Sequence, residues 1–454
     1  MGIHDAVADV VVRGGRIRTF DEHDTVTEAL AIRDGRIVAS GPAAEALPAA
    51  RVIELDGRTV LPGINDAHLH AAWLGARWPH LFFGDAAHAH APEGRLVETE
   101  TERRDALTRA WRLLASLGIT SYTEPGMGPG EDDGETGCFG QDMLDTYVAL
   151  HRAGAQTARV TLLRLFGRLD GEAHLADVRR GVASPIPETD PRWLNIAGVK
   201  IFADGIPPMR TAWVREPYLD GTAGELLTRG SDPVAAFRGM IAAALDAGCQ
   251  IAVHATGDRS IEEFVTALEE HGAATGHLAQ QSARHPGGHY VVHADMVDAG
   301  LLEWMARAGV GVAVQPVIAD LTGAWMEPAI GAARTAAAWP LRDMIGLGVQ
   351  TTITSDAPIA TPDWRATLDA ALILLGDDTP GIRRDLLHRV TTVPAAQDAA
   401  AHWKGALAPG YAADLVVLDE DPAEPGRPLA DIGVAATIVD GRVVFERGEA
   451  PDPE

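Results

Sequence analysis

The chain of 454 residues contains little cysteine, with Cys138 and Cys249 as its two thiols. Two cysteines argue against the disulfide framework that stabilises small secreted domains. Hydrophobic residues make up 46% of the chain, which is enough to build a large apolar core instead. Cys249 directly precedes an apolar run, and we interpret it as a small buried side chain rather than a nucleophile.

Positive charge is also scarce, since 38 lysines and arginines stand against 64 aspartates and glutamates, a formal net charge of -26. Such an acidic chain repels nucleic acids and anionic membranes, so we expect neither as a partner. Long apolar runs are missing as well, and the first residues lack a basic segment followed by an apolar one. We therefore expect a cytoplasmic protein whose partner is a small-molecule substrate.

Both ends of the chain carry short apolar strands separated by glycine turns. Near the N-terminus an Asp34-Gly35 pair lies between two apolar runs, which is a strong hairpin signal. Near the C-terminus, Asp414–Leu418 and Ala436–Phe445 have the same character. This pattern predicts one small β-sandwich domain assembled from residues 1–62 and 404–454.

Between these ends, over residues 63–403, apolar strands alternate with longer amphipathic segments such as Arg104–Leu117. Parallel strands need crossover helices, and continuous apolar runs indicate burial on both faces of a sheet. Eight such units predict an α/β fold of the (β/α)8 TIM barrel type. The expected strands are Val60–His68, Ile119–Thr123, Arg159–Phe166, Asn195–Ala203, Gln250–His254, Tyr290–His293, Gly311–Gln315 and Thr351–Ser355.

Polar residues fall at the carboxyl end of one predicted strand after another. His68 and His70 come first, and an extended chain would direct both side chains to the same side. A barrel gathers its strand ends on one face, where imidazoles and a carboxylate can bind a zinc-like ion. Singly, each histidine is more often a hydrogen-bonded residue, and Asp356 could cap a turn, so the set as a whole favours a metal. The predicted ligands are His68, His70, Lys200, His254, His293 and Asp356.

Two motifs flank the predicted barrel: Pro62-Gly63-(x)2-Asp66-Ala67-His68-Leu69-His70 before it, and Gly405-(x)4-Gly410-(x)3-Asp414-Leu415-Val416 after it. In these motifs the chain resembles the metal-dependent amidohydrolase superfamily, and the resemblance extends over nearly the whole chain. It is also similar to the branch that contains N-substituted formamide deformylases. The segments that carry this second similarity are Val199–Gly205, Arg210–Ala212, His254–Arg259, Gln315-Pro316 and Ser355–Pro358.

The resemblance implies one or two divalent metal ions as cofactors, zinc first, with cobalt, manganese or iron as alternatives. A carboxylated Lys200 would bridge two ions, because a carbamate is anionic whereas cations would repel a lysine ammonium. If Lys200 stays unmodified, a mononuclear site is the alternative. The ligands implied are His68, His70 and Asp356 for one ion, and His254 and His293 for the other.

Asp356 is also the predicted catalytic residue. On this hypothesis the metal lowers the pKa of a bound water, and Asp356 accepts its proton as general base and passes it to the leaving nitrogen. Glu124, after the second strand, is either an extra ligand or a carboxylate in a turn, and we favour the turn. The branch commonly has a glutamate before the histidine of the sixth strand, whereas this chain has Val292.

Substrate contacts are predicted in the loops. Trp73, Trp78, Phe82 and Phe83 follow the two histidines and wall an apolar pocket, unless they serve only to pack the loop. Arg210 could bind a substrate carboxylate or carbonyl through its guanidinium fork. Alternatively, Arg210 forms a salt bridge with a nearby aspartate, Asp204 or Asp258, as loop scaffolding.

We therefore predict a metal-dependent hydrolase that acts on carbon–nitrogen bonds other than peptide bonds. The expected substrate is a small, largely uncharged amide, carbamate or thiocarbamate, attacked by metal-activated water. A deaminase or a ring-opening hydrolase of a cyclic amide or imide is the alternative, since the same metals could serve it. A non-catalytic barrel protein is a third class, against which the intact ligand set counts. We also expect a homo-oligomer, because barrels of this type often associate through exposed surface.

Overall fold

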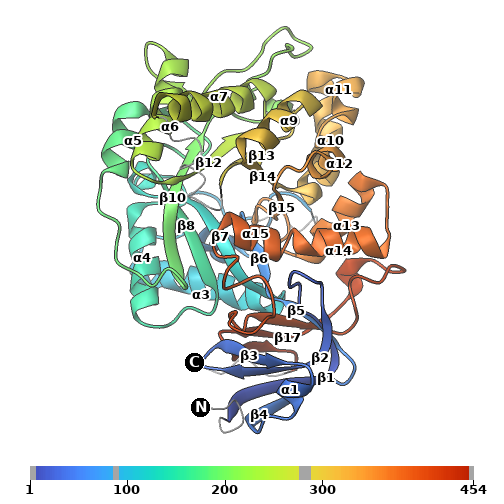
Figure 1. The fold of residues 1–454 in the computed structure, drawn as a ribbon. Helices are drawn as coiled ribbons and strands as arrows, with labels where there is room; N and C mark the ends of the chain where they lie inside the picture. The colour runs from blue at the N-terminus through green and yellow to red at the C-terminus, as the bar shows by residue number, and fades with distance from the viewer. Residues whose placement is uncertain (1–6, 85–90, 276–287, 449–454) are drawn as a thin grey trace.

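The computed structural model describes residues 7–84, 91–275 and 288–448. Within these ranges the chain forms two eight-stranded sheets, one rolled into a barrel surrounded by helices and one formed by the chain ends (Figure 1). The predicted sandwich includes residues 1–6 and 449–454, and the predicted barrel includes residues 85–90 and 276–287; these four segments lie outside the described residues.

The barrel sheet has the strand order β6-β7-β8-β10-β12-β13-β14-β15, and every neighbouring pair is parallel. The chain after β15 returns to β6, where the Asp356 N–H donates to the carbonyl of His68 at 2.9 Å, so the sheet is nearly closed. This architecture confirms the predicted TIM barrel. The strands are β6 Ile64–Asp66, β7 Ile119–Met127, β8 Arg159–Leu165, β10 Leu194–Phe202, β12 Gln250–Ala255, β13 His289–His293, β14 Val310–Val314 and β15 Thr351–Ile353.

Helices cover the outside of the barrel (Figure 1). The predicted helix Arg104–Leu117 begins earlier, at Glu100, because Thr99 and Glu102 form a capping box that satisfies the free N–H groups of the first turn. The helices of the barrel are α2 Ala71–Arg77, α3 Glu100–Ser116, α4 Gln141–Arg152, α5 Leu175–Val182, α6 Pro233–Asp246, α7 Asp258–Thr275, α9 Ala299–Ala308, α10 Pro316–Ile330, α11 Ala332–Ala336, α12 Leu341–Gly346, α13 Trp364–Leu375, α14 Pro380–His388 and α15 Thr392–Gln397.

The second sheet combines both ends of the chain, as predicted, and lies below the barrel in Figure 1. Its order is β18-β17-β16-β5-β1-β2-β3, with β4 pairing with β1. The short helix α1, Pro42–Glu45, follows β3. The strands are β1 Ala8–Arg18, β2 Val26–Arg33, β3 Arg36–Ser40, β4 Ala49–Glu54, β5 Thr59–Pro62, β16 Leu415–Leu418, β17 Val434–Val439 and β18 Arg442–Glu446.

The predicted continuous strand Val60–His68 is wrong, because the chain leaves one sheet and enters the other at Gly63. β5 ends at Pro62 in the terminal sheet, and β6 begins at Ile64 in the barrel. Glycine is required between them, since a Cβ at Gly63 would lie 2.1 Å from Thr120 Oγ1. The change of sheet falls next to the boundary expected between the two domains, whose exact ranges stay a prediction.

A buried ion-pair cluster joins the two sheets. Arg159, the first residue of β8, donates from Nε and Nη2 to the carboxylate of Asp414 at 2.6 and 3.0 Å. Its Nη2 also donates to Asp440 at 3.0 Å. Because the guanidinium and the Asp414 carboxylate are both buried and bonded through two parallel hydrogen bonds, this contact fixes the terminal sheet against the barrel.

Candidate metal centre

Three buried side chains converge at the carboxyl end of the barrel: His68, His70 and Asp356. Their ligand atoms all lie within 4.8 Å of one another. Asp356 Oδ1 is 3.3 Å from His68 Nε2 and 3.5 Å from His70 Nε2. Ligands bound tetrahedrally to zinc, at about 2.0–2.1 Å, lie about 3.4 Å apart. The spacing and the donor types therefore fit a zinc-sized cation.

Backbone pairing, rather than strand alternation, brings these residues together. β6 ends at Asp66, so the expectation that an extended chain aligns His68 and His70 is wrong. Instead, the Asp356 N–H donates to the His68 carbonyl at 2.9 Å, and the His70 N–H donates to the Ala357 carbonyl at 2.7 Å. Asp356 has a φ of 55°, a conformation that costs a non-glycine residue on the order of 1–3 kcal/mol. The pairing on both sides holds the strained residue in place.

The carboxylate of Asp66 supports this segment from below. It accepts hydrogen bonds from the His68 N–H at 3.2 Å and from the Ser355 N–H at 3.3 Å. Burial raises the pKa of Asp66 to about 7, although the bonds from Ser355 and His68 act in the opposite direction. One side chain thus ties the chain before the first histidine to the chain before Asp356.

The charges within the triad favour cation binding. Burial, with Lys200 nearby, holds the pKa of His68 well below its ordinary value, so this imidazole is neutral. Burial would raise the pKa of Asp356, but the contacts with His68 and His70 outweigh it and hold that pKa well below the ordinary value. Burial lowers the pKa of His70, yet Asp356 and Glu124 outweigh it and raise that pKa to about 9. A metal ion would therefore displace a proton from His70.

Glu124 fixes the orientation of His70. It is fully buried within β7, so the interpretation as a turn carboxylate is wrong. Its carboxylate accepts from His70 Nδ1 at 3.3 Å, from the Ala71 N–H at 2.8 Å and from the Tyr147 hydroxyl at 3.0 Å. With the proton of His70 held on Nδ1, the Nε2 atom is directed toward Asp356 as a ligand atom.

His254 and His293 form a second pair beside the triad, with ring centroids 4.5 Å apart. His293 Nδ1 donates to Gln315 Oε1 at 2.8 Å, and Gln315 Nε2 in turn donates to Thr354 Oγ1 at 2.8 Å. His254 Nε2 lies 3.3 Å from the carbonyl of Gly205. Burial lowers the pKa of His293 to about 4 and holds that of His254 well below its ordinary value. Both rings are neutral, as metal ligands must be.

Lys200 is 2% exposed and lines the same cavity as the four histidines, where burial and its charge together lower the pKa of His68, His254 and His293. Within the part of the chain that the structure describes, its Nζ atom has no hydrogen-bond partner. The ammonium lies 5.0 Å from the centroid of the Phe202 ring. Burial lowers the pKa of Lys200 to about 8, against the attraction of Asp356 and Asp170. The amine is therefore neutral more readily than an exposed lysine.

A cavity of about 490 Å³ opens above these residues. Trp73, Phe82 and Phe83 line it as expected, whereas Trp78 is 42% exposed and does not. The Trp73 and Phe82 rings lie 4.8 Å apart, and the Phe83 ring lies 5.3 Å from that of Trp325. The cavity is thus a largely apolar chamber with aromatic walls, and all six predicted ligands line it.

Arg210 lies outside the lining of this cavity. Its Nε forms an ion pair with Asp220 at 3.1 Å, and its Nη2 donates to the Pro328 carbonyl at 3.1 Å. The expected salt bridge to Asp204 or Asp258 is wrong, because other groups occupy both carboxylates. A role for Arg210 in substrate binding stays a prediction.

Asp204 instead anchors the start of α7. Fully buried, it accepts from the N–H groups of Trp213, Thr256 and Gly257 at 2.8, 3.0 and 2.9 Å, and from Ser260 Oγ at 2.5 Å. These bonds fix the chain directly after His254. Burial raises the pKa of Asp204 to about 6, and the four bonds partly offset this.

Asp295 was not predicted, although it lines the cavity. It accepts from Trp339 Nε1 at 2.9 Å, and burial raises its pKa to about 7. Gln315 belongs to the Gln315-Pro316 motif, from which no role in the site was predicted. Both follow the ends of barrel strands, β13 and β14, so extending the strand-end argument by two residues would have found them.

Residues 81–445 match the Amidohydrolase family. The chain belongs to this family. The matched range includes Lys200, His254, His293 and Asp356, whereas His68 and His70 lie shortly before it. Membership confirms the predicted superfamily and the prediction of a hydrolytic enzyme.

Relatives of this amidohydrolase carry several names. The Putative amidohydrolase YtcJ of Bacillus subtilis is 27% identical over 56% of this chain, but the match spans only 48% of that protein. An Imidazolonepropionase of Chromobacterium violaceum is 28% identical over 89% of this chain and 88% of its own. The N-substituted formamide deformylase of Arthrobacter pascens is 21% identical over 97% of this chain and 98% of its own, in agreement with the predicted branch.

The solved structure of an uncharacterized metal-dependent hydrolase from Pyrococcus horikoshii has the same fold. It superposes with a TM-score of 0.70 at 19% identity, over 93% of this chain and 99% of that one. Among the described residues of this amidohydrolase, no helix is both long and apolar enough to cross a membrane.

Proposed function

We propose that this amidohydrolase cleaves the C–N bond, or a related acyl bond, of a small and largely uncharged amide, carbamate or thiocarbamate with water. The observation that carries the proposal is the triad of His68, His70 and Asp356, whose spacing suits a tetrahedral metal ion at the floor of a cavity. Metal-assisted hydrolysis requires this combination of imidazoles, a carboxylate and a sheltered chamber, and a bound metal would displace the proton of His70.

The residues also support a second divalent ion held by His254 and His293. Both rings are neutral, and Lys200 offers a buried amine whose charge acts on His68 of the triad as well as on His254 and His293. Carboxylation of Lys200 would turn this uncompensated amine into an anionic bridge. Zinc suits the nitrogen-rich ligand set best, and cobalt, manganese or iron are the alternatives.

When bound, the metal lowers the pKa of water toward neutrality and polarises an amide carbonyl. Asp356, held by backbone bonds on both sides, accepts the proton of the attacking water. The same carboxyl then returns this proton to the nitrogen as the C–N bond breaks. The products are an amine and an acid, which is a carboxylic acid from an amide and a carbonic acid monoester, or its thio analogue, from a carbamate or thiocarbamate. Glu124 keeps His70 in the orientation that the metal needs.

The cavity supports an uncharged substrate. Its described lining is largely apolar and contains no arginine, whereas three carboxylates face it, those of Asp170, Asp295 and Asp356. Apart from Lys200, which is assigned to the metal centre, the described lining offers no lysine or arginine to pair with a charged substrate group, so it favours a neutral one. Trp73, Phe82 and Phe83 provide aromatic surface for a neutral group.

Metal analysis combined with a substrate panel tests the proposal. The panel contains formamides, amides, carbamates, thiocarbamates and cyclic imides, each assayed with and without a chelator. We expect turnover of a neutral acyclic compound that stops when the metal is removed, and turnover that resists the chelator would refute the mechanism. Release of ammonia identifies the deaminase alternative, and ring opening without a released amine identifies the cyclic one. A protein without stoichiometric metal or activity would favour the non-catalytic class.

Asp356→Asn tests the assignment of the general base. We expect turnover to fall by about 10²–10⁴-fold while much of the metal remains bound. Asp220→Asn, which removes a carboxylate outside the cavity lining, is the matched control and should keep full activity. Retained activity in Asp356→Asn would reject its assignment as the general base.

The sequence also predicts a homo-oligomer in the cytoplasm, and both of these stay predictions.

A further inference from the structure

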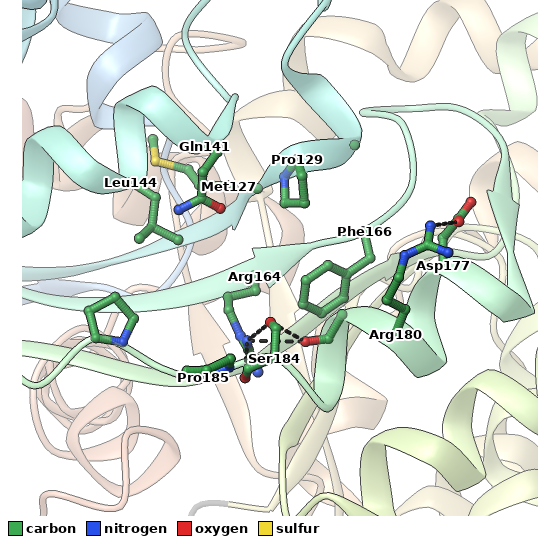
Figure 2. A pocket seen from close by; sticks show the side chains of 14 residues that line it. Met127, Pro129, Gln141, Leu144, Arg164, Phe166, Asp177, Arg180, Ser184 and Pro185 are labelled. Carbon is green, nitrogen blue, oxygen red and sulfur yellow. Dashed lines mark hydrogen bonds and ion pairs between the residues drawn. The ribbon is translucent and has the colours of Figure 1, made fainter.

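A second cavity, of about 460 Å³, lies on the outer side of the barrel wall between β8, α4 and α5 (Figure 2). It shares no described lining residue with the cavity above the metal centre. Leu163 packs with residues of the barrel interior, so Arg164, the next residue of β8, faces outward into this region. The outer cavity is therefore built around an arginine that the proposed hydrolysis does not use.

Arg164 is only 5% exposed and half of its guanidinium is unpaired. Nη1 donates to the carbonyls of Gly181 and Ser184 at 3.2 and 3.3 Å, and to Ser184 Oγ at 3.1 Å. Within residues 7–84, 91–275 and 288–448, the Nε and Nη2 atoms have no nitrogen or oxygen atom as a hydrogen-bond partner, and the side chain has no ion pair with a carboxylate. The Cys249 thiol interacts with the guanidinium, but burial raises the pKa of this thiol, so it is neutral and supplies no counter-charge. A buried charge without a counter-charge is costly.

Arg159, five residues earlier on the same strand, shows what is missing. It is buried to a similar extent, and the same edge of its guanidinium, Nε and Nη2, forms two parallel hydrogen bonds with the Asp414 carboxylate. The corresponding edge of Arg164 lacks such a partner. The two arginines of β8 thus differ in their counter-charge. Arg159 is paired with a carboxylate of the protein, whereas Arg164 is paired with none in the described residues.

The surroundings indicate which anion would fit. The ring of Phe166 lies 5.1 Å from the guanidinium carbon of Arg164, and Met127 and Leu144 add apolar wall. Asp177 and Arg180, the other charged residues of the lining, pair with each other, as Figure 2 shows. The net unpaired charge is therefore one guanidinium edge next to apolar surface.

We propose that this outer cavity binds a small carboxylate with an apolar tail. Nε and Nη2 of Arg164 donate two parallel hydrogen bonds to its carboxylate, as the same atoms of Arg159 do to Asp414. The tail packs against Phe166, Met127 and Leu144. The carboxylate of the ligand supplies the counter-charge that Arg164 lacks among the described residues.

Calorimetric titration of the purified metal-loaded protein with hexanoate tests the proposal. 2-Heptanone, which has a similar shape but no charge, acetate, which has no tail, and inorganic phosphate serve as comparisons. We expect hexanoate to bind at one site and the three other compounds to bind at least about tenfold more weakly. Phosphate or acetate binding as tightly as hexanoate would overturn the ligand class.

Variants then locate the site. Arg164→Met should weaken hexanoate binding by about 10- to 100-fold, because two hydrogen bonds to a charged group are lost. Gln141→Trp should also block binding, since it fills the cavity and leaves Arg164 in place, whereas the matched Gln141→Ala should bind normally. Circular dichroism checks the fold, and if Arg164→Met does not fold, the two Gln141 variants decide.

The metal centre is the competing site for a carboxylate. His70→Ala disrupts that centre and leaves the outer cavity intact, so we expect hexanoate to bind this variant as it binds the wild type. Binding that is lost in His70→Ala and kept in Arg164→Met would place the carboxylate at the metal and overturn the proposal. Unchanged binding in both Arg164→Met and Gln141→Trp would overturn it as well.

Discussion

The chain contains two lysines, and the barrel buries them at opposite ends. Lys404 lies at the amino end, where its ammonium donates to Asp398 at 2.6 Å and lies 3.5 Å from Ser121 Oγ. Asn65 donates to the same carboxylate at 2.8 Å. Lys200 lies toward the carboxyl end, where its Nζ has no hydrogen-bond partner in the described structure.

The difference separates two uses of buried polarity. At the amino end the charge of Lys404 is paired with that of Asp398, and Asn65 Nδ2 donates to the same carboxylate, so this cluster holds the strands together. At the carboxyl end, Lys200 Nζ and His68 Nδ1 are buried without partners among the described residues. At the amino end Asn65 Oδ1 also lacks a partner among these residues, but an unpaired buried ammonium costs more than an unpaired neutral atom. The carboxyl end, which retains the unpaired lysine, is therefore arranged for a ligand or a metal rather than for stability.

The largest effect should come from removing the paired lysine at the amino end of the barrel. Lys404→Met leaves Asp398 as an uncompensated buried charge, and we expect the free energy of unfolding to fall by about 3–5 kcal/mol. Urea denaturation measures this loss. Removing both charges, with Lys404→Met and Asp398→Leu together, should recover most of it, and a loss below about 1 kcal/mol in the single variant would contradict the comparison.

The unpaired Lys200 should change how the free energy of unfolding depends on pH. In metal-free protein without bicarbonate, the pKa of Lys200 is lowered from 10.5 to about 8, so between these values the folded state binds fewer protons than the unfolded state. The free energy of unfolding attributable to Lys200 should therefore rise with pH across this window, by up to about 3 kcal/mol. Denaturation of wild type and Lys200→Met at several pH values isolates this contribution, and parallel curves would reject it.

Metal binding should depend on Lys200 and not on Lys404. We expect Lys200→Met to lower metal affinity by about 10- to 100-fold while the protein stays folded. With 13C-labelled bicarbonate, a carbamate signal in the NMR spectrum should appear in wild type and be absent from Lys200→Met. Because the chain has only two lysines, Lys404→Met shows which of them carries the carbamate. A signal that disappears in Lys404→Met would place the carbamate on Lys404, at the amino end, and would contradict the prediction.

The smallest effect should come from the wall of the metal-site cavity. Phe83→Ala removes aromatic surface beside Trp325, and we expect KM for a neutral substrate to rise by about 3- to 10-fold with kcat largely retained. Trp78→Ala is the control from the same segment, because Trp78 does not line the cavity. An equal rise in KM for both variants would show that the loop, rather than the cavity wall, is responsible.

The sequence predicted which residues gather at the carboxyl end of the barrel because strand ends can be recognised locally, and their role as ligands stays a prediction. His254 and His293 each follow an apolar run, and barrel closure brings such ends to one face whatever the details of the loops. It did not predict the break at Gly63, since this depends on the side chain of Thr120 from another strand. The contacts of Arg210 with the Pro328 carbonyl and of Glu124 with His70 were not predicted for the same reason, because these partners come from segments distant along the chain.

The two histidines after β6 illustrate the difference between what the sequence determined and what the tertiary structure decided. The sequence by itself determined the barrel, the sheet built from both termini and the residue types at the strand ends, since these follow from local patterns of apolar and polar residues. Only the tertiary structure decided how His68 and His70 meet Asp356, because backbone bonds from the last strand impose that geometry. It also decided which buried charges are paired, because a counter-charge such as Asp414 or Asp398 reaches its partner only when the chain is folded.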